Sequence, residues 1–446
     1  MIAKLCMVLI FIGVAVGVGI YCRRSTASVD GFVLGGRSVG PWMSAFAFGT
    51  SYFSAVVFVG YAGQFGWKYG IAAFWAGITN AILGSLLAWW VLGPRTREMT
   101  HRLGATTMPE FFGLRYDSKA LRVAAAAIIF VFLIPYTASV YNGLSRLFGM
   151  AFGLPYEVCV IGMAVITCVY VVLGGYMATV MNDFIQGIVM LLGIVAVIVA
   201  VLVNNGGFTE ALTTLSLIPA EGSEMAGPFV SFFGPNLPDL IGVIVLTSLG
   251  TWGLPQMVQK FYAIKSGPAI KQGAIISTVF AMVVAGGSYF LGGFGRLYGD
   301  QVEMTAAGTP VYDSIMPTML STLPDLLIGI VIVLVLSASM STLSSLVLTS
   351  SSTLTLDLLK DNVVKNMSEK KAAGVHARAD RGVHRDLGGD RAGAVQLVHH
   401  VHRTADEHLV GRAGRFVLGA PSSGGCTRVA CRVRLCGPGF IVGVGL

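Results

Sequence analysis

The segment spanning residues 333–358 constrains the fold more than any other part of the sequence. It is apolar enough to cross a membrane, yet twelve of the nineteen residues from Ser337 to Thr355 are Ser or Thr. These side chains compete with a helix for its own backbone groups, so such a run would be unusual in a water-soluble core. In a bilayer their hydroxyls can bond back to the preceding turn, line a polar cavity or join helices. The segment therefore predicts a membrane-spanning helix.

Four residues of this segment share one helical face, because Ala338, Ser341, Thr342 and Ser345 stand at i, i+3, i+4 and i+7. The face offers oxygen atoms and no charge, which suits a weakly held monovalent cation. A helix-packing role for the hydroxyls explains the same pattern equally well. The segment alone leaves both interpretations open.

The composition indicates a multi-pass protein of the lipid bilayer, and we expect this bilayer to be the plasma membrane. Of the 446 residues, 54% are apolar and 12% charged, against about 25% charged in soluble domains. The first apolar run ends at Arg23-Arg24 without a cleavage site, so we expect a retained spanning helix at residues 1–22. A span needs roughly 20 apolar residues. Nine segments qualify: about 5–22, 41–64, 70–93, 120–146, 155–175, 183–203, 238–259, 271–296 and 324–356.

Basic residues between the predicted spans indicate the orientation of the chain, since Lys and Arg concentrate in cytoplasmic loops. They follow the first, third, seventh and ninth spans, whereas the opposite side gathers acidic residues. We therefore expect the N-terminus outside the cell. The basic residues concerned are Arg23, Arg24, Arg37, Arg95, Arg97, Arg102, Arg115, Lys119, Arg122, Lys260, Lys265, Lys271, Lys360, Lys365, Lys370 and Lys371.

Two predicted spans carry helix-interrupting residues. The second contains Gly49-Thr50-Ser51, and the seventh contains Gly250, Gly253 and Pro255. Unwound backbone at membrane depth is tolerated where it lines a cavity or is buried in protein. Interrupted helices at corresponding positions of two halves point to a transporter binding site. These spans are five apart, as a five-plus-five inverted repeat requires. For the second span, a close helix contact through small residues is the alternative.

Asp183 opens the sixth predicted span and has two interpretations. As a helix cap it would serve the local backbone, and this interpretation is favoured. As one of few acidic residues on the cytoplasmic side, it could instead serve ion exit.

The last 75 residues differ in character from the rest. Residues 372–446 hold ten Arg, six of the seven His and no Lys, and no convincing spanning segment. The Cys and His spacing fits no standard zinc pattern. We expect neither a metal site nor a nucleic-acid partner here, and interpret 372–446 as an out-of-frame tail.

Four motifs occur in order along the chain: FVLGGRS at 32–38, LGGY with NDFIQG within 173–187, GTWGLPQ at 250–256 and ASMSTLS at 338–344. Together they resemble the sodium/solute symporter family, whose members carry small solutes with sodium. The resemblance covers about residues 1–365. It implies an all-α, leucine-transporter-like inverted repeat preceded by one extra helix. The implied division is 1–22 extra helix, 41–203 first repeat, 204–237 extracellular loop, 238–359 partial second repeat and 372–446 tail.

The resemblance also implies which residues bind the transported species. It implies a sodium site made by backbone carbonyls and hydroxyls of Thr50, Phe53, Ala338, Ser341 and Thr342. The implied substrate pocket includes Ser54, Thr247, Thr251 and Trp252, and Asp183 would serve sodium exit to the cytoplasm.

Three departures from the family pattern bear on substrate and activity. Proline carriers have an Asp where this chain has Tyr52, and sugar carriers have polar residues near Phe74 and Gly77. The tail replaces the last two core helices expected of the second repeat. The chain therefore resembles an incomplete symporter.

We interpret the function as sodium-coupled symport of a small organic solute by alternating access, with Na⁺ as coupling ion and no cofactor. The alternatives are a proton-coupled or uncoupled carrier, a non-functional truncated symporter, and a sensory or interaction protein that uses the transporter fold. We do not expect an enzyme, since the sequence has no nucleophile–base set and no phosphate loop.

Overall fold

The computed structural model of the chain describes residues 2–23, 28–220, 226–306 and 308–359. Within these residues every regular element is helical, and β-structure is limited to two isolated bridges. The predicted all-α class is therefore confirmed. The predicted out-of-frame tail, 372–446, lies outside the described residues.

The described residues form α-helices and shorter 3-10 or π-helical turns. The α-helices are α1 (Ile2–Tyr21), α2 (Val29–Leu34), α3 (Pro41–Tyr52), α4 (Ala62–Tyr69), α5 (Phe74–Thr79), α6 (Ala88–Leu103), α7 (Met108–Arg115), α8 (Lys119–Phe152), α9 (Tyr156–Asn204), α10 (Phe208–Ser216), α11 (Leu237–Gly250), α12 (Pro255–Ala263), α13 (Gly267–Ala281), α14 (Gly287–Gly292), α15 (Tyr312–Ser321) and α16 (Asp325–Ser352). The turns are η2 (Gly35–Arg37), η3 (Val56–Tyr61), η4 (Gly70–Ala73), η5 (Asn80–Leu87), η6 (Thr251–Gly253), η7 (Met282–Gly286), η8 (Gly295–Gln301) and η9 (Thr353–Leu359).

Local sequence sets where several of these helices begin and end. Ser118 and Ser266 accept hydrogen bonds from backbone N–H groups in the first turns of α8 and α13, which satisfies donors that the helix itself leaves free. Gly104 and Gly153 end α6 and α8 in the left-handed conformation, which glycine adopts without a steric penalty. Helix boundaries in this chain thus follow ordinary capping chemistry.

Six helices of the described residues are long and apolar enough to cross a membrane, or seven when α11 to η6 and α12 count as one bent span. Two of them are 48-residue runs, Val56–Leu103 and Glu157–Asn204. Each run contains a glycine with non-helical backbone, Gly70 (φ 61°, ψ −140°) and Gly175 (φ 54°, ψ −145°). A run of this length can supply two spans. The count of nine spans and the outside N-terminus stay predictions.

The predicted gap between the fifth and sixth spans is wrong. We expected helices at 155–175 and 183–203, whereas α9 continues through residues 176–182 and changes direction at Gly175 alone. A side chain at Gly175 would meet the backbone of Phe32, and its positive φ favours glycine. The change of chain direction that we expected over seven connecting residues therefore occurs at one glycine.

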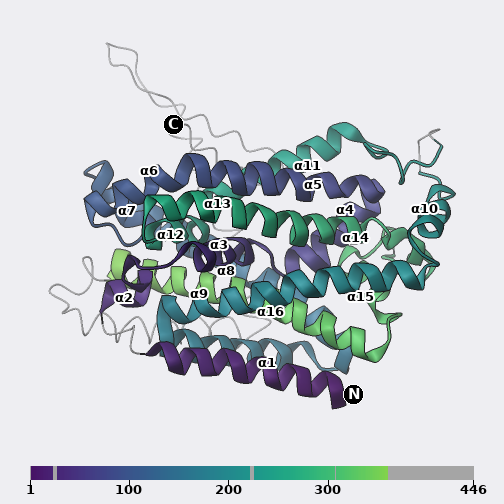
Figure 1. Cartoon of the computed structure of the whole chain (residues 1–446), viewed down its shortest axis with the longest axis horizontal. Helices are drawn as coiled ribbons and strands as arrows, with labels where there is room; N and C mark the ends of the chain where they lie inside the picture. Colours follow the sequence, from purple (N-terminus) through teal and green to yellow (C-terminus); the bar gives the residue numbers. More distant parts are fainter. Residues whose placement is uncertain (1, 24–27, 221–225, 307, 360–446) are drawn as a thin grey trace, which may run out of the picture. The chain divides into compact units, whose positions relative to one another are not determined.

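Helix α16, the Ser/Thr-rich segment, lies at the core of the described part of the chain. It packs against α9, α8, α3 and α1, and α1 can be followed along α9 and α16 in Figure 1. Every residue from Leu334 to Ser352 is buried. The hydroxyls of Ser344, Thr349 and Ser352 donate hydrogen bonds to carbonyls of the preceding turn. Their hydrogen-bonding groups are therefore paired within the helix.

An ionic cluster holds the end of this helix to its neighbours. The fully buried carboxylate of Asp357 accepts from Arg122 Nε at 2.8 Å and from Thr107 Oγ1 at 2.7 Å. Arg122 also approaches Glu110, at 3.8 Å. These residues come from η9, α8, α7 and its N-cap, so the cluster joins elements far apart in the sequence.

Arg122→Met should strongly destabilise the protein, because it removes the charge that compensates a buried carboxylate. Breaking a buried ion pair costs about 3–5 kcal/mol. We expect the detergent-solubilised variant to melt well below the parent in a thermal unfolding experiment. The control is Arg102→Met, since Arg102 pairs with Glu98 at the exposed surface and such pairs contribute about 0–1 kcal/mol. Equal melting of both variants would contradict the structural role of the cluster.

Candidate functional site

The interruption predicted in the second span lies at the end of α3. The helix ends at Tyr52, and Phe53 has extended backbone (φ −80°, ψ 110°) before the helical turn resumes. The prediction of a break is confirmed, but the unwound residues are Phe53 and Ser54 rather than the Gly49-Thr50-Ser51 triplet. A side chain at Gly49 would meet the ring of Phe280, so the close-contact interpretation also holds at that glycine.

The break leaves backbone carbonyls free to face α16, because the last carbonyls of a helix have no partner within it. Ser341 Oγ lies 3.1 Å from the Thr50 carbonyl oxygen and 3.0 Å from that of Ala338. Thr342 Oγ1 lies 3.3 Å from the Thr50 oxygen, 3.4 Å from the Phe53 oxygen and 3.1 Å from the Ala338 oxygen. All five residues are at most 1% exposed. We call these five atoms the oxygen cluster.

The oxygen cluster is rich in acceptors. Two hydroxyls can donate one hydrogen bond each, while three carbonyl oxygens lie within 3.4 Å of them. Unwound backbone carbonyls coordinate sodium ions in transporters built from interrupted helices. All five oxygens are neutral, so the cluster suits a monovalent cation that must also be released.

The favoured interpretation of Asp183 as a helix cap is wrong. Asp183 lies eight residues beyond the Gly175 break, inside α9, and is fully buried. Its Oδ2 lies 3.5 Å from Nζ of Lys260. The assignment of Lys260 to a cytoplasmic loop is also wrong, because it lies within α12 and is 1% exposed.

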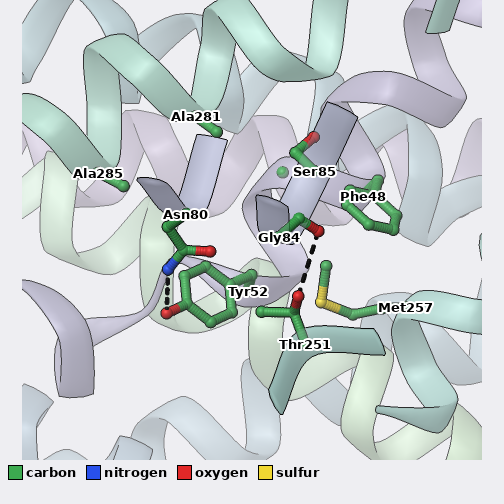
Figure 2. Close-up of a pocket in the computed structure, with 10 residues that line it drawn as sticks. Phe48, Tyr52, Asn80, Gly84, Ser85, Thr251, Met257, Ala281 and Ala285 are labelled. Carbon is green, nitrogen blue, oxygen red and sulfur yellow. Dashed lines mark hydrogen bonds between the residues drawn. The ribbon is translucent and has the colours of Figure 1, made fainter. Parts of the chain in front are cut away.

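A small pocket is lined in part by Phe48 and Tyr52, near the end of α3 (Figure 2). Asn80 Nδ2 donates to Tyr52 Oη at 2.5 Å, and Thr251 Oγ1 donates to the Gly84 carbonyl at 3.2 Å. None of the ten lining residues carries a charge. They are Phe48, Gly49, Tyr52, Asn80, Gly84, Ser85, Thr251, Met257, Ala281 and Ala285.

Of the four residues predicted for the substrate pocket, Thr251 lines this one. Ser54 Oγ accepts from the backbone N–H of Val56. Thr247 donates to carbonyls of its own helix, and Trp252 Nε1 donates to the Leu83 carbonyl at 2.8 Å. These three are absent from the lining.

Asn80 and Ser85 line the pocket but were not among the residues predicted for it. Both are polar residues within the predicted span 70–93. Polar side chains inside a span mark functional positions, and this signal could have found them. The predicted break of the seventh span, in contrast, is confirmed: α11 with η6 and α12 meet at 49° around Leu254.

The segment from Gly49 to Phe53, at the end of α3, contributes to both the pocket and the oxygen cluster. Gly49 and Tyr52 line the pocket, whereas the carbonyls of Thr50 and Phe53 belong to the oxygen cluster. A solute that moves this turn would therefore also move two of the five oxygens.

Known proteins resemble this chain over most of its length. The profile of the sodium:solute symporter family matches residues 32–379. Sodium/proline symporters of Staphylococcus aureus strains JH9 and Mu3 are each 30% identical over 360 residues, 79% of this chain and 68% of the relative. A solved structure of a Na⁺-coupled sialic acid symporter, in a substrate-bound outward-open state, superposes with a TM-score of 0.73 at 18% identity. It covers 92% of this chain and 84% of that one.

The structural match shows a shared fold, and the profile and the relatives show common ancestry. The expected multi-pass membrane architecture and sodium-coupled solute symport are thereby confirmed at the level of the family. The chain belongs to the sodium:solute symporter family.

Proposed function

We propose that this chain moves a small organic solute inward across the plasma membrane with one sodium ion bound at the oxygen cluster. The ligands would be the carbonyls of Thr50, Phe53 and Ala338 and the hydroxyls of Ser341 and Thr342. The observation that carries the proposal is their convergence, through contacts of 3.0–3.4 Å between α16 and the interrupted α3. The shared turn from Gly49 to Phe53 supplies a physical link between ion and solute.

Sodium supplies the driving force in this proposal. Moving one charge through the membrane potential contributes about 2.3 kcal/mol per 100 mV, before the concentration gradient of sodium is counted. Alternating access, with the two repeats rocking about the site, follows from the family fold. The repeat boundaries at 41–203 and 238–359 are part of the proposal.

The pocket favours a solute without net charge. Its lining combines an aromatic face from Phe48 and Tyr52 with neutral hydrogen-bonding groups from Asn80, Ser85 and Thr251, the usual composition of a small-molecule site. Its volume of about 20 Å³ holds about one water molecule. Solute entry therefore requires the pocket to enlarge, and in this proposal the turn around Tyr52 moves as it does so.

Proline is the first solute to test, since relatives at 30% identity are named for it. Tyr52 replaces the acidic residue of proline carriers, so other zwitterionic and neutral solutes belong in the same panel, with sialic acid as an anionic member.

Uptake into proteoliposomes with sodium outside and potassium inside tests the proposal. We expect solute accumulation that collapses when potassium replaces external sodium. Uptake that follows a pH gradient at equal sodium would indicate a proton-coupled carrier instead. Sodium-dependent solute binding without uptake would favour a sensory role for the fold.

Asn80→Leu should weaken solute binding about tenfold or more, because losing a hydrogen-bonding group that a polar solute uses costs about 1–3 kcal/mol. Sodium binding without solute should change far less, since Asn80 contributes no oxygen to the cluster and reaches its turn only through the Tyr52 hydroxyl. The control is Asn204→Leu, as Asn204 bonds Thr322 at an exposed position. Both variants are assayed by radiolabelled solute binding and by isotopic sodium binding. Parallel losses in both assays for Asn80→Leu would contradict its assignment to the pocket.

A further inference from the structure

The side chain of Lys260 fills a buried cation position. Its Nζ lies 3.5 Å from Asp183 Oδ2, donates to Ser345 Oγ at 3.1 Å and lies 5.2 Å from the centre of the Tyr176 ring. These groups come from α9 and α16, and Lys260 itself is 1% exposed. A carboxylate, a hydroxyl and an aromatic face therefore surround the ammonium, and each of them attracts a cation.

The Asp183 carboxylate depends on this ammonium. It is fully buried, and among the described residues no hydrogen bond reaches either of its oxygens. An uncompensated buried charge is strongly destabilising. Asp183 can therefore stay ionised only with a positive charge beside it, and the Lys260 ammonium supplies that charge.

This cation position adjoins the oxygen cluster. Ser345 lies one helical turn after Ser341 on α16, and its hydroxyl lies 2.9 Å from that of Ser51, the residue after Thr50. Ser51 in turn donates to the Ala47 carbonyl at 2.6 Å. A chain of hydrogen bonds thus runs from Lys260 through Ser345 to Ser51. It connects α12 with α16 and α3, the two helices that form the oxygen cluster.

We propose that the Lys260 ammonium is a tethered cation that occupies a second cation site, so that the chain binds one exchangeable sodium and not two. A carboxylate with a neighbouring hydroxyl offers hard oxygen ligands that suit a cation. With the ammonium present the position is neutralised, and a free sodium has no net charge to compensate there. This inference rests on the proposed function, because it concerns the ion stoichiometry of the same transporter.

Isotopic sodium binding to the purified chain by equilibrium dialysis tests the inference. We expect one sodium per chain for the parent and for Lys260→Arg, which keeps a cation at the position. Lys260→Met should bind two, since sodium then compensates Asp183. The double variant D183N/K260M should return to one. A folded Lys260→Met that binds one sodium, or a parent that binds two, would overturn the tethered-cation role.

The variant Asp183→Asn tests the same inference and does not require Lys260→Met to fold. It leaves an uncompensated ammonium beside the oxygen cluster, so we expect sodium affinity to fall at least about tenfold. D183N/K260M should restore affinity to within about threefold of the parent. Unchanged affinity in Asp183→Asn would also overturn the inference. A parent that binds no sodium would instead refute the proposed function, so the two failures are distinguishable.

Discussion

The double variant S341A/T342A should lose sodium binding almost completely. Each hydroxyl contributes one of the five oxygens of the cluster, and a hydrogen-bonding contact to a charged group is worth about 1.5–3 kcal/mol. One such loss weakens binding about 10- to 150-fold. Because the two residues are neighbours their effects need not add, but we expect roughly 100-fold or more for the pair. Isotopic sodium binding measures it directly.

A matched control exists on the same helix. Ser351 and Ser352 are buried in α16 and both donate to the carbonyl of Leu348, so S351A/S352A removes two hydroxyls without touching the oxygen cluster. We expect its sodium affinity to match that of the parent within about threefold, because these hydroxyls share no partner with the oxygen cluster and the two sites should act independently. Equal losses in the two double variants would mean that the Ser/Thr face acts through helix packing, the alternative that the sequence left open.

The second large effect is expected from Gly66→Ala. A methyl group at Gly66 in α4 would overlap the carbonyl group of Gly292 in α14, and one at Gly292 would overlap the carbonyl of Ala62. The obstacle is backbone on both sides, so no side chain can rotate away. The helices would have to separate, with overpacking and lost contacts costing about 3 kcal/mol, the upper end of the usual range, because the obstacle is backbone. We expect Gly66→Ala to lose the monodisperse elution of the parent in detergent.

Gly13→Ala is the control for this substitution. Gly13 also lies inside a helix, α1, but a methyl group there has no atom within 4 Å. Replacing a helical glycine with alanine is favourable by about 0.5–1 kcal/mol. We therefore expect Gly13→Ala to elute and melt like the parent or slightly better. Normal behaviour of Gly66→Ala would mean that α4 and α14 do not meet as closely as described.

The fold class and the presence of both helix interruptions could be predicted from local sequence, although the α3 break lies at Phe53 and Ser54 and not at the Gly49-Thr50-Ser51 triplet. Apolar runs of span length and the Gly and Pro residues within them are visible in the sequence alone. The break at Gly175 was harder to foresee, because Leu173-Gly174-Gly175-Tyr176, with the polar pair Asn182-Asp183 shortly after it, also fits a loop. What makes it a sharp bend is the backbone of Phe32 packed against Gly175, a contact between distant segments.

The face of α16 that carries Ala338, Ser341 and Thr342 was predictable from their spacing, whereas Thr50 and Phe53 entered the predicted set through the resemblance to the sodium/solute symporter family. The role of the oxygen cluster as a sodium site stays a prediction. The Asp183–Lys260 pair was not predictable, because Lys260 follows a predicted span and is counted as an ordinary loop charge. Its burial depends on α12 packing against α3 and α16. Asn80 could have been found from its polarity within a predicted span, but its hydrogen bond to Tyr52, 28 residues away, could not.

The most direct test of the central claim is a high-resolution structure of the purified chain determined in sodium and again in potassium. We predict a peak in the sodium map among the carbonyls of Thr50, Phe53 and Ala338 and the hydroxyls of Ser341 and Thr342, weakened or absent in the potassium map. A sodium map in which these hydroxyls still donate to the carbonyls with no peak between them would contradict the account.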